Sequence, residues 1–254
     1  MKAFAKLDGV KFFVCAAALA SLAACGGGGG SDSDGNGAGT STTVTGTAAK
    51  GAMLVGANIE LTCANGAKLT AVTGGNGAYS AAGQVGYPSI GSASLGGRAY
   101  RGVLMSGAVA NFTPLTDVMT EVTLAASGSG ASSLSIAQFI ERTRADATFA
   151  KNVAAAAASY RAAALDAIAS RLLAASKLQA EIDRILAAAR ATPFDSTVFA
   201  LGSDLDKVLD STASTLQNPD GSVKTDVLNA AKAAGDALPL PGGAATGATR
   251  GSRN

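Results

Sequence analysis

The sequence of 254 residues contains no histidine and no tryptophan, and aromatic side chains make up only 5% of it. The absence of histidine excludes the commonest general base, the Ser–His and Cys–His nucleophile pairs, and every metal site that needs an imidazole. The shortage of aromatic rings argues against the stacking platforms that bind single-stranded nucleic acids. Carboxylate pairs and Ser–Lys pairs stay open as catalytic groups. We therefore expect no cofactor and no metal site, and we assign no catalytic residue.

Beyond the first 24 residues, the chain also lacks an excess of positive or negative charge. The net charge is +2, but the first 24 residues hold three of the 20 basic side chains and one of the 18 acidic ones. The remainder carries 17 of each sign and is neutral. It offers no overall positive field to attract nucleic acid, so we expect no nucleic-acid partner.

The N-terminus has the three parts of an export signal. A basic stretch, Met1–Lys11, precedes a short apolar run from Phe12 to Ala20, and small residues follow. This order is typical of a secretory signal peptide. A membrane-spanning helix needs roughly 20 apolar residues, and this run is much shorter. We predict a signal peptide over residues 1–24 and no membrane-spanning helix later in the chain.

The sequence Leu22-Ala23-Ala24-Cys25 resembles the lipobox of bacterial lipoproteins. The resemblance implies a diacylglyceryl group on the Cys25 thiol, cleavage between Ala24 and Cys25, and usually acylation of the new amine. Two or three acyl chains make a stable anchor where one binds only marginally. Gly26 stands where an Asp favours inner-membrane retention in enterobacterial lipoproteins, which implies the outer membrane, on its periplasmic or surface face. Ordinary secretory cleavage, with Cys25 unmodified, is the alternative.

The anchor accounts for two of the three cysteines. Cys15 leaves with the signal peptide and Cys25 carries the lipid, so Cys63 has no partner for an intrachain disulfide. We expect Cys63 to be a small buried hydrophobe in a strand. An intermolecular bridge or a reactive thiol is the alternative.

Residues 25–42 are predicted to be a tether behind the anchor. Glycine, serine and other small polar residues dominate them, so they can bury almost nothing and should remain disordered. As a flexible coil such a segment spans roughly 20–25 Å. Asp32–Gly37 imitates the start of a calcium-binding loop, but Thr43 falls where a bidentate Glu is required. A solvated linker is therefore the expected interpretation.

The residue pattern of 43–112 predicts short strands. Asn58–Cys63 alternates polar and apolar residues, as a half-buried strand does, and Asn65-Gly66 is a strong hairpin signal before Lys68–Thr73. Further strand-like runs are Ile90–Leu95, Ala99–Met105 and Ala108–Phe112. We predict a small antiparallel β-sandwich.

Within this region a second resemblance covers about 40 of the 254 residues. The segments that carry it are Gly46-Thr47, Gly51-Ala52, Leu54–Ile59 and Asn76–Ser80. They resemble the carboxypeptidase-regulatory-like, transthyretin-like Ig-type domain, although Met53 replaces the usual Pro and Gly74-Gly75 the usual acidic residue. The resemblance implies an Ig-like (prealbumin-like) sandwich packed by Tyr79, used for accessory or adhesion roles and without an active site.

Residues 113–235 are predicted to be helical, which makes the fold class α+β. Thr113 can cap a helix that starts at Pro114 and runs to about Ala126, and the sequence at 111–116 is similar to a junction in lipoproteins with the same β module followed by helices. Ser135 and Gln138 form the next capping box, with Leu134 stapled to Phe139.

One long amphipathic stripe then runs from Asp146 to about Ala191. We expect Ser203 to cap a helix over 204–211, Asn218–Gly221 to turn the chain, and a last helix over 223–234 to end near Gly235. The whole would be an Ala-rich helical hairpin or bundle, followed by a disordered tail over 236–254. A partner-binding coiled coil is the alternative for the long stripe.

One acidic cluster stands out in this region, formed by Asp195, Asp204, Asp206 and Asp210. It could bind a cation, but such residues are more often helix caps and a solvated face.

The sequence favours a lipid-anchored, non-enzymatic envelope protein with a binding or scaffolding role, whose partner is an envelope protein or a polysaccharide. A periplasmic hydrolase that uses a carboxylate pair or Ser–Lys is one alternative. An accessory subunit of a transport or secretion system is the other.

Overall fold

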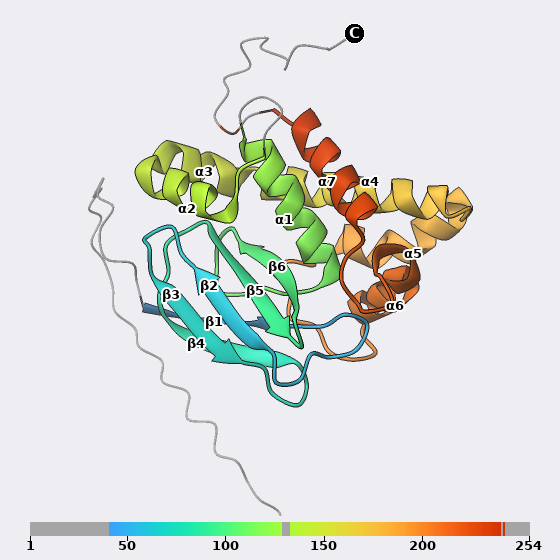
Figure 1. Ribbon diagram of the computed structural model, residues 1–254, viewed down its shortest axis with the longest axis horizontal. Helices are drawn as coiled ribbons and strands as arrows, with labels where there is room; N and C mark the ends of the chain where they lie inside the picture. Colours follow the sequence, from blue (N-terminus) through green and yellow to red (C-terminus); the bar gives the residue numbers. More distant parts are fainter. Residues whose placement is uncertain (1–40, 129–132, 240, 242–254) are drawn as a thin grey trace, which may run out of the picture. The chain divides into compact units, whose positions relative to one another are not determined.

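The computed structural model describes residues 41–128, 133–239 and 241 (Figure 1). This part of the chain is α+β, as predicted: its strands come first and its helices follow. The strands form two small antiparallel sheets. Their bounds are β1 Ser41–Thr47, β2 Asn58–Thr62, β3 Lys68–Val72, β4 Ala78–Gln84, β5 Ser89–Leu95 and β6 Arg98–Leu104.

The larger sheet has the strand order β3-β2-β5-β6, and β1 pairs with β4 in the smaller one. Buried Leu61 of β2 lies opposite buried Leu69 of β3 on one side and buried Gly91 of β5 on the other. The register thus places buried residues of neighbouring strands opposite one another. The predicted turn at Asn65-Gly66 closes the β2–β3 hairpin, with Gly66 at a φ of +85°. The Asn65 side-chain oxygen accepts a hydrogen bond from the Ala67 N–H at 3.1 Å.

The predicted strand at Ala108–Phe112 was wrong, although this segment does run beside β1 in parallel. Its backbone bonds to β1 at both ends, from the Thr45 N–H to the Ala108 carbonyl and from the Phe112 N–H to the Thr47 carbonyl. Between them the Thr47 N–H bonds instead to the side-chain oxygen of Asn111, at 2.9 Å. The ladder is therefore interrupted, and only isolated bridges remain.

The first two helices start where predicted. Helix α1 (Pro114–Ser127) begins after Thr113, whose hydroxyl accepts a hydrogen bond from the Thr116 N–H. Helix α2 (Ile136–Ala145) has the predicted capping box of Ser135 and Gln138. Each side chain satisfies a backbone donor that the first helical turn leaves without a partner.

The long stripe from Asp146 to Ala191 is not one helix but three. They are α3 (Ala147–Ala155), α4 (Ala157–Ala174) and α5 (Gln179–Ala191). Ser176 ends α4 with a left-handed φ of +64°. The N–H groups of Ser176 and Lys177 bond back to the carbonyls of Leu173 and Leu172, which is the Schellman pattern. Serine thus occupies the position where glycine is the usual signal.

The last two helices also differ in extent from the predictions. Helix α6 (Asp204–Leu216) starts at the predicted cap Ser203 but extends beyond residue 211. Helix α7 (Thr225–Ala237) passes through Gly235, where we expected an end. A Cβ atom on Gly235 would lie 2.4 Å from the carbonyl oxygen of Val122 in α1. This glycine therefore serves close helix packing and not a helix cap.

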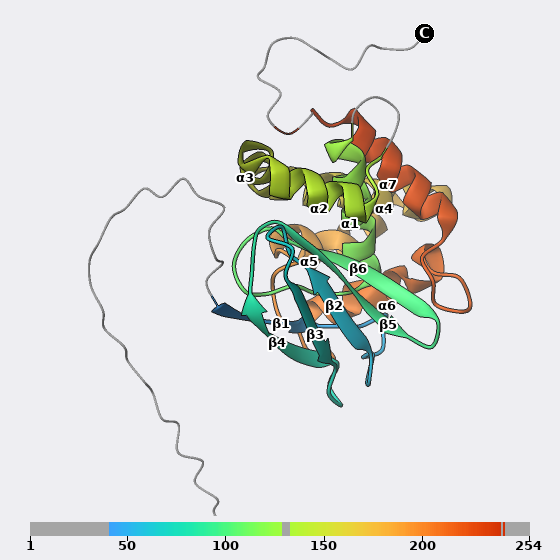
Figure 2. The same ribbon diagram turned by 60° about the vertical axis from the view of Figure 1, so that its left-hand side comes forward.

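Helix α1 lies between the larger sheet and the other helices, packing against β6, α7 and α4 (Figures 1 and 2). The buried residues of the strands and of the helices belong to a single hydrophobic core. Tyr79 is buried in it, with its ring centroid 5.5 Å from that of Phe112 and its hydroxyl bonded to the Ala110 carbonyl at 2.7 Å. Over the described ranges, the helices are all too short or too polar to cross a bilayer.

Candidate functional site

The residues with the clearest predicted chemistry lie outside the described ranges. These are the lipidation residue Cys25, the cleavage position at Ala24 and the calcium-like segment 32–37. Cys63 is described: it directly follows β2, has no exposed surface and is a free thiol. Its position is that of a small buried hydrophobe.

The four carboxylates of the predicted acidic cluster act separately. Asp195 is buried and pairs with Arg161 at 3.1 Å. Asp206 is buried too and accepts a hydrogen bond from the Gly202 N–H at 2.8 Å. Asp204 is exposed and pairs with Lys207, and Asp210 is exposed on α6. Across the described part of the chain, no three acidic or cysteine side chains converge as metal ligands would.

Two further carboxylates are used by one ion-pair network between β6 and α1. Arg101 donates hydrogen bonds to Asp117 and Glu121, the first at 2.5 Å and the second at 3.1 Å. Burial raises the pKa of Asp117, and Arg101 offsets only part of that rise. Because both carboxylates face the same guanidinium, the network joins the sheet to α1.

Asn111 makes three side-chain hydrogen bonds at the junction between strands and helices. It is fully buried, and its amide nitrogen donates to the carbonyls of Phe194 and Thr197 at 2.9 and 2.7 Å. Its oxygen accepts from the Thr47 N–H, as described above. One side chain thereby ties β1 to the loop between α5 and α6. The role is structural, and it explains the asparagine of the 111–116 junction.

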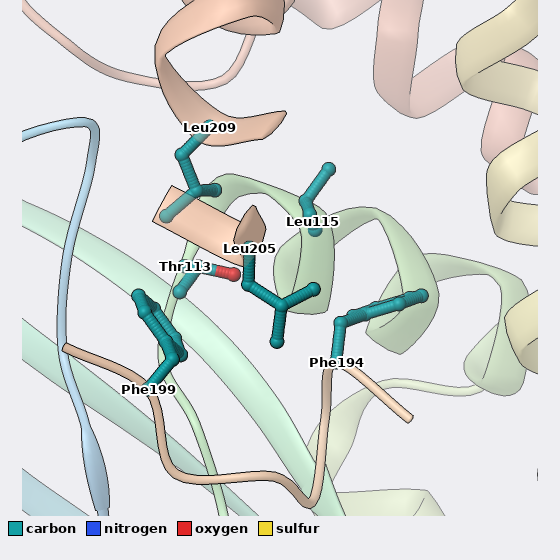
Figure 3. A pocket seen from close by; sticks show the side chains of 6 residues that line it. All are labelled: Thr113, Leu115, Phe194, Phe199, Leu205 and Leu209. Atoms are coloured by element: carbon teal, nitrogen blue, oxygen red, sulfur yellow. The ribbon is translucent and has the colours of Figure 1, made fainter. Parts of the chain in front are cut away.

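An apolar gap lies next to this junction, where α6 and its preceding loop meet the start of α1 (Figure 3). Its empty volume is about 160 Å³, but it has no room for a water molecule. It is therefore a packing seam and not a ligand site. Its lining residues are Thr113, Leu115, Phe194, Phe199, Leu205 and Leu209.

The candidate site is an open groove, which we call the basic groove. It consists of two hollows of about 370 and 550 Å³ that share Ser214 and Lys224. The first lies between the ends of α4 and α6 and the start of α7, and the second extends to the loop after β1. The groove is lined by Lys50, Gly51, Ala52, Arg171, Ala174, Ala175, Lys177, Ala213, Ser214, Thr215, Gln217, Asn218, Pro219, Gly221, Lys224 and Asp226.

Four cations line the groove against one carboxylate, Asp226. Arg171 forms an ion pair with Asp226, and Lys177 pairs at 2.7 Å with Glu181, which lies beside the groove. The Lys224 ammonium donates to the backbone carbonyl of Ser214 at 2.7 Å. That contact leaves two of its three hydrogens for a ligand. Asp226 and Glu181 thus offset two of the four cations, and Lys50 and Lys224 give the groove its remaining positive charge, which suits an anion.

Hydrogen bonds hold the groove walls in place. The side chain of Gln217 donates to the Lys50 carbonyl at 3.0 Å, which joins the loop after β1 to the end of α6. The predicted turn at Asn218–Gly221 is present, with the Gly221 N–H bonded to the Asn218 carbonyl. Tyr100 of β6 donates its hydroxyl to the Gly221 carbonyl and so fixes the turn to the sheet.

A Ser–Lys pair exists in the groove, but its geometry is not that of a nucleophile and its base. Lys224 contacts the carbonyl of Ser214 and not its hydroxyl. A general base must lie within hydrogen-bond reach of the proton that it removes. The arrangement instead resembles a lysine that satisfies the free carbonyls at the end of α6.

The basic groove was not among the sites predicted from the sequence. Its cations come from the loop after β1, from α4 and its following turn, and from the residue before α7. These segments are far apart in the sequence, and none of the cations belongs to a recognisable local motif. The balanced charge of the chain after residue 24 gave no sign that four cations would line one surface. Only the packing of α4, α6 and α7 brings them together.

No protein-family model, no curated protein and no solved structure matches this chain.

Proposed function

We propose that this protein is a lipid-anchored, non-enzymatic component of the cell envelope with a binding or scaffolding role. Cys25 would hold it in the outer membrane, as the lipobox resemblance implies. The basic and apolar parts of residues 1–20 support export, and the small residues before Cys25 support cleavage there.

We assign the accessory role of an Ig-like, prealbumin-like module to the strand region. The two antiparallel sheets support this finer assignment, as does the burial of Tyr79 where the family pattern places a packing tyrosine. In such modules the loops between strands carry the binding surface. Here the loop after β1 contributes Lys50 to the basic groove.

The basic groove is the main structural support for a binding role. It is wide, open and positively charged, and its walls are held by hydrogen bonds from three separate parts of the chain. An open groove with fixed walls and free donors suits a bound partner.

Metabolic labelling with a fatty-acid analogue tests the anchor in a bacterium with an outer membrane. We expect the full chain to take up the label and to fractionate with the outer membrane. Cys25→Ser should lose both properties, whereas Cys63→Ser, the matched control, should keep the label. Equal labelling of the wild type and Cys25→Ser would contradict the anchor.

The binding role is tested by immobilising the compact unit of residues 36–254 and passing envelope extract over it. This unit contains the whole described core, so it can be used without the signal peptide and anchor. We expect Lys50→Glu/Lys224→Glu to retain less material than the wild type. Identical retention by both proteins would contradict a binding role for the groove.

A further inference from the structure

We propose that the basic groove binds an acidic polysaccharide, that is, a sugar chain that carries carboxylate or phosphate groups. This inference rests on the proposed binding role and names the partner of that same site. Three features of the groove carry it: the charge of its lining, the kind of neutral side chains in it, and its place relative to the start of β1.

The charge of the lining points to an anion. Lys50, Arg171, Lys177 and Lys224 line the groove with Asp226 as the one lining carboxylate. These cations are distributed along both hollows, with Lys224 where the two meet. An extended ligand with repeated negative charges can therefore contact several of them at once.

The neutral side chains favour a glycan over a protein. Protein interfaces depend on aromatic, methionine or other large anchors that fill pockets. The apolar side chains that line the groove are alanines and one proline, Pro219. Its other neutral side chains are hydroxyls and amides, among them Ser214, Thr215 and Gln217, which suit sugar hydroxyls. Without aromatic rings for stacking, charge must supply much of the affinity, so the sugar must be acidic.

The elements that form the groove lie on the far side of the fold from the start of β1. The described part of the protein begins with β1 at the left of Figure 1, whereas the loop after β1, the end of α6 and the start of α7 lie at the right, and Figure 2 agrees. The start of the described chain therefore does not lie across the groove, which leaves both hollows open to an extended ligand.

Binding of defined polymers to the compact unit of residues 36–254 tests the inference by isothermal titration calorimetry. Polygalacturonate supplies carboxylates on a sugar chain, and dextran of similar length is the neutral counterpart. Polyphosphate and phosphatidylglycerol vesicles supply anions without sugar. We expect binding of polygalacturonate, little of dextran, and weakening as salt rises, because exposed charge pairs are screened.

Charge reversal in the groove supplies the matched comparison. Lys50→Glu/Lys224→Glu should weaken polygalacturonate binding at least about tenfold, since two attractive contacts become repulsive. Lys68→Glu/Lys151→Glu changes the net charge equally at exposed sites outside the groove, and should leave the affinity within about twofold. Circular dichroism of both variants checks that the fold is kept.

Several results would overturn the inference. They are equal binding of dextran, equal weakening by the two double variants, preference for polyphosphate or vesicles over the sugar polymer, and no binding of any polymer. None of these results would affect fatty-acid labelling at Cys25. The anchor and the ligand assignment can therefore fail separately.

Discussion

Replacing Asn111 by alanine should be among the most destabilising single changes in this protein. The fully buried side chain makes three hydrogen bonds, which join β1 to the loop between α5 and α6. Alanine removes all three and leaves the Thr47 N–H and the carbonyls of Phe194 and Thr197 without these partners. The perturbation therefore acts on two parts of the chain that are far apart in sequence.

The magnitude follows from the groups left behind. An unsatisfied buried polar group costs about 1–3 kcal/mol. Three such groups would cost about 3–9 kcal/mol, and relaxation of the loop should keep the loss near the lower end, about 3–5 kcal/mol. A domain has only about 5–15 kcal/mol of stability in total. Asn111→Ala should thus bring the protein close to unfolding at room temperature.

Urea unfolding of the compact unit, followed by circular dichroism, measures this loss. Asn58→Ala, at an exposed position in β2, is the control and should stay within about 0.5 kcal/mol of the wild type. Asn111→Asp should be at least as harmful as Asn111→Ala, because a carboxylate would face two carbonyl oxygens. A loss below about 1 kcal/mol for Asn111→Ala would refute the reasoning.

Three further predictions concern other elements. Gly235→Ala should lower the free energy of unfolding by about 2 kcal/mol in urea, because its Cβ would overlap α1, whereas Gly75→Ala, with open space around it, should change it by less than about 0.5 kcal/mol. Ser176→Gly should raise the melting temperature, since glycine adopts the positive φ of this position without strain, with a gain of about 0.5–1 kcal/mol; a lower melting temperature would contradict this. Burial raises the pKa of Tyr160 to about 12 and that of Tyr79 further, while unfolded tyrosine ionises near 10. Because the fold favours the protonated form, these two tyrosines should leave stability unchanged below about pH 10 and lower it progressively as the pH rises from about 10 to 12. Tyrosinate absorbance should then rise together with unfolding, and full ionisation of the folded protein near pH 10 would contradict this.

Local signals explain what the sequence could predict of the fold. Thr113, Ser135 and Ser203 each cap a helix at the expected residue, because a cap depends on neighbours within one turn. The Asn65-Gly66 hairpin and the Asn218–Gly221 turn follow from equally local chemistry.

Features that depend on contacts between residues far apart in the sequence could not be predicted. The break after α4 has no glycine or proline to mark it, since Ser176 takes the left-handed position. Gly235 carried the usual signal of a helix end, yet the helix continues because α1 packs against it there. The Ala108–Phe112 segment has a strand pattern, and one buried side chain, Asn111, interrupts its pairing.

The candidate functional residues show the same difference between local and distant signals. Cys25 was assigned from a short motif, and this assignment stays a prediction because the residue lies outside the described ranges. The basic groove could not be predicted, because its cations are brought together by helix packing.

Mass spectrometry of the mature N-terminus, on protein extracted from the membranes of its producing cells, would decide whether Cys25 is lipidated. We predict a chain that begins at Cys25 and carries a diacylglyceryl group on the thiol, with or without a further acyl chain on the amine. A mature chain that begins at another residue, or one that begins at Cys25 with a free thiol, would contradict the account.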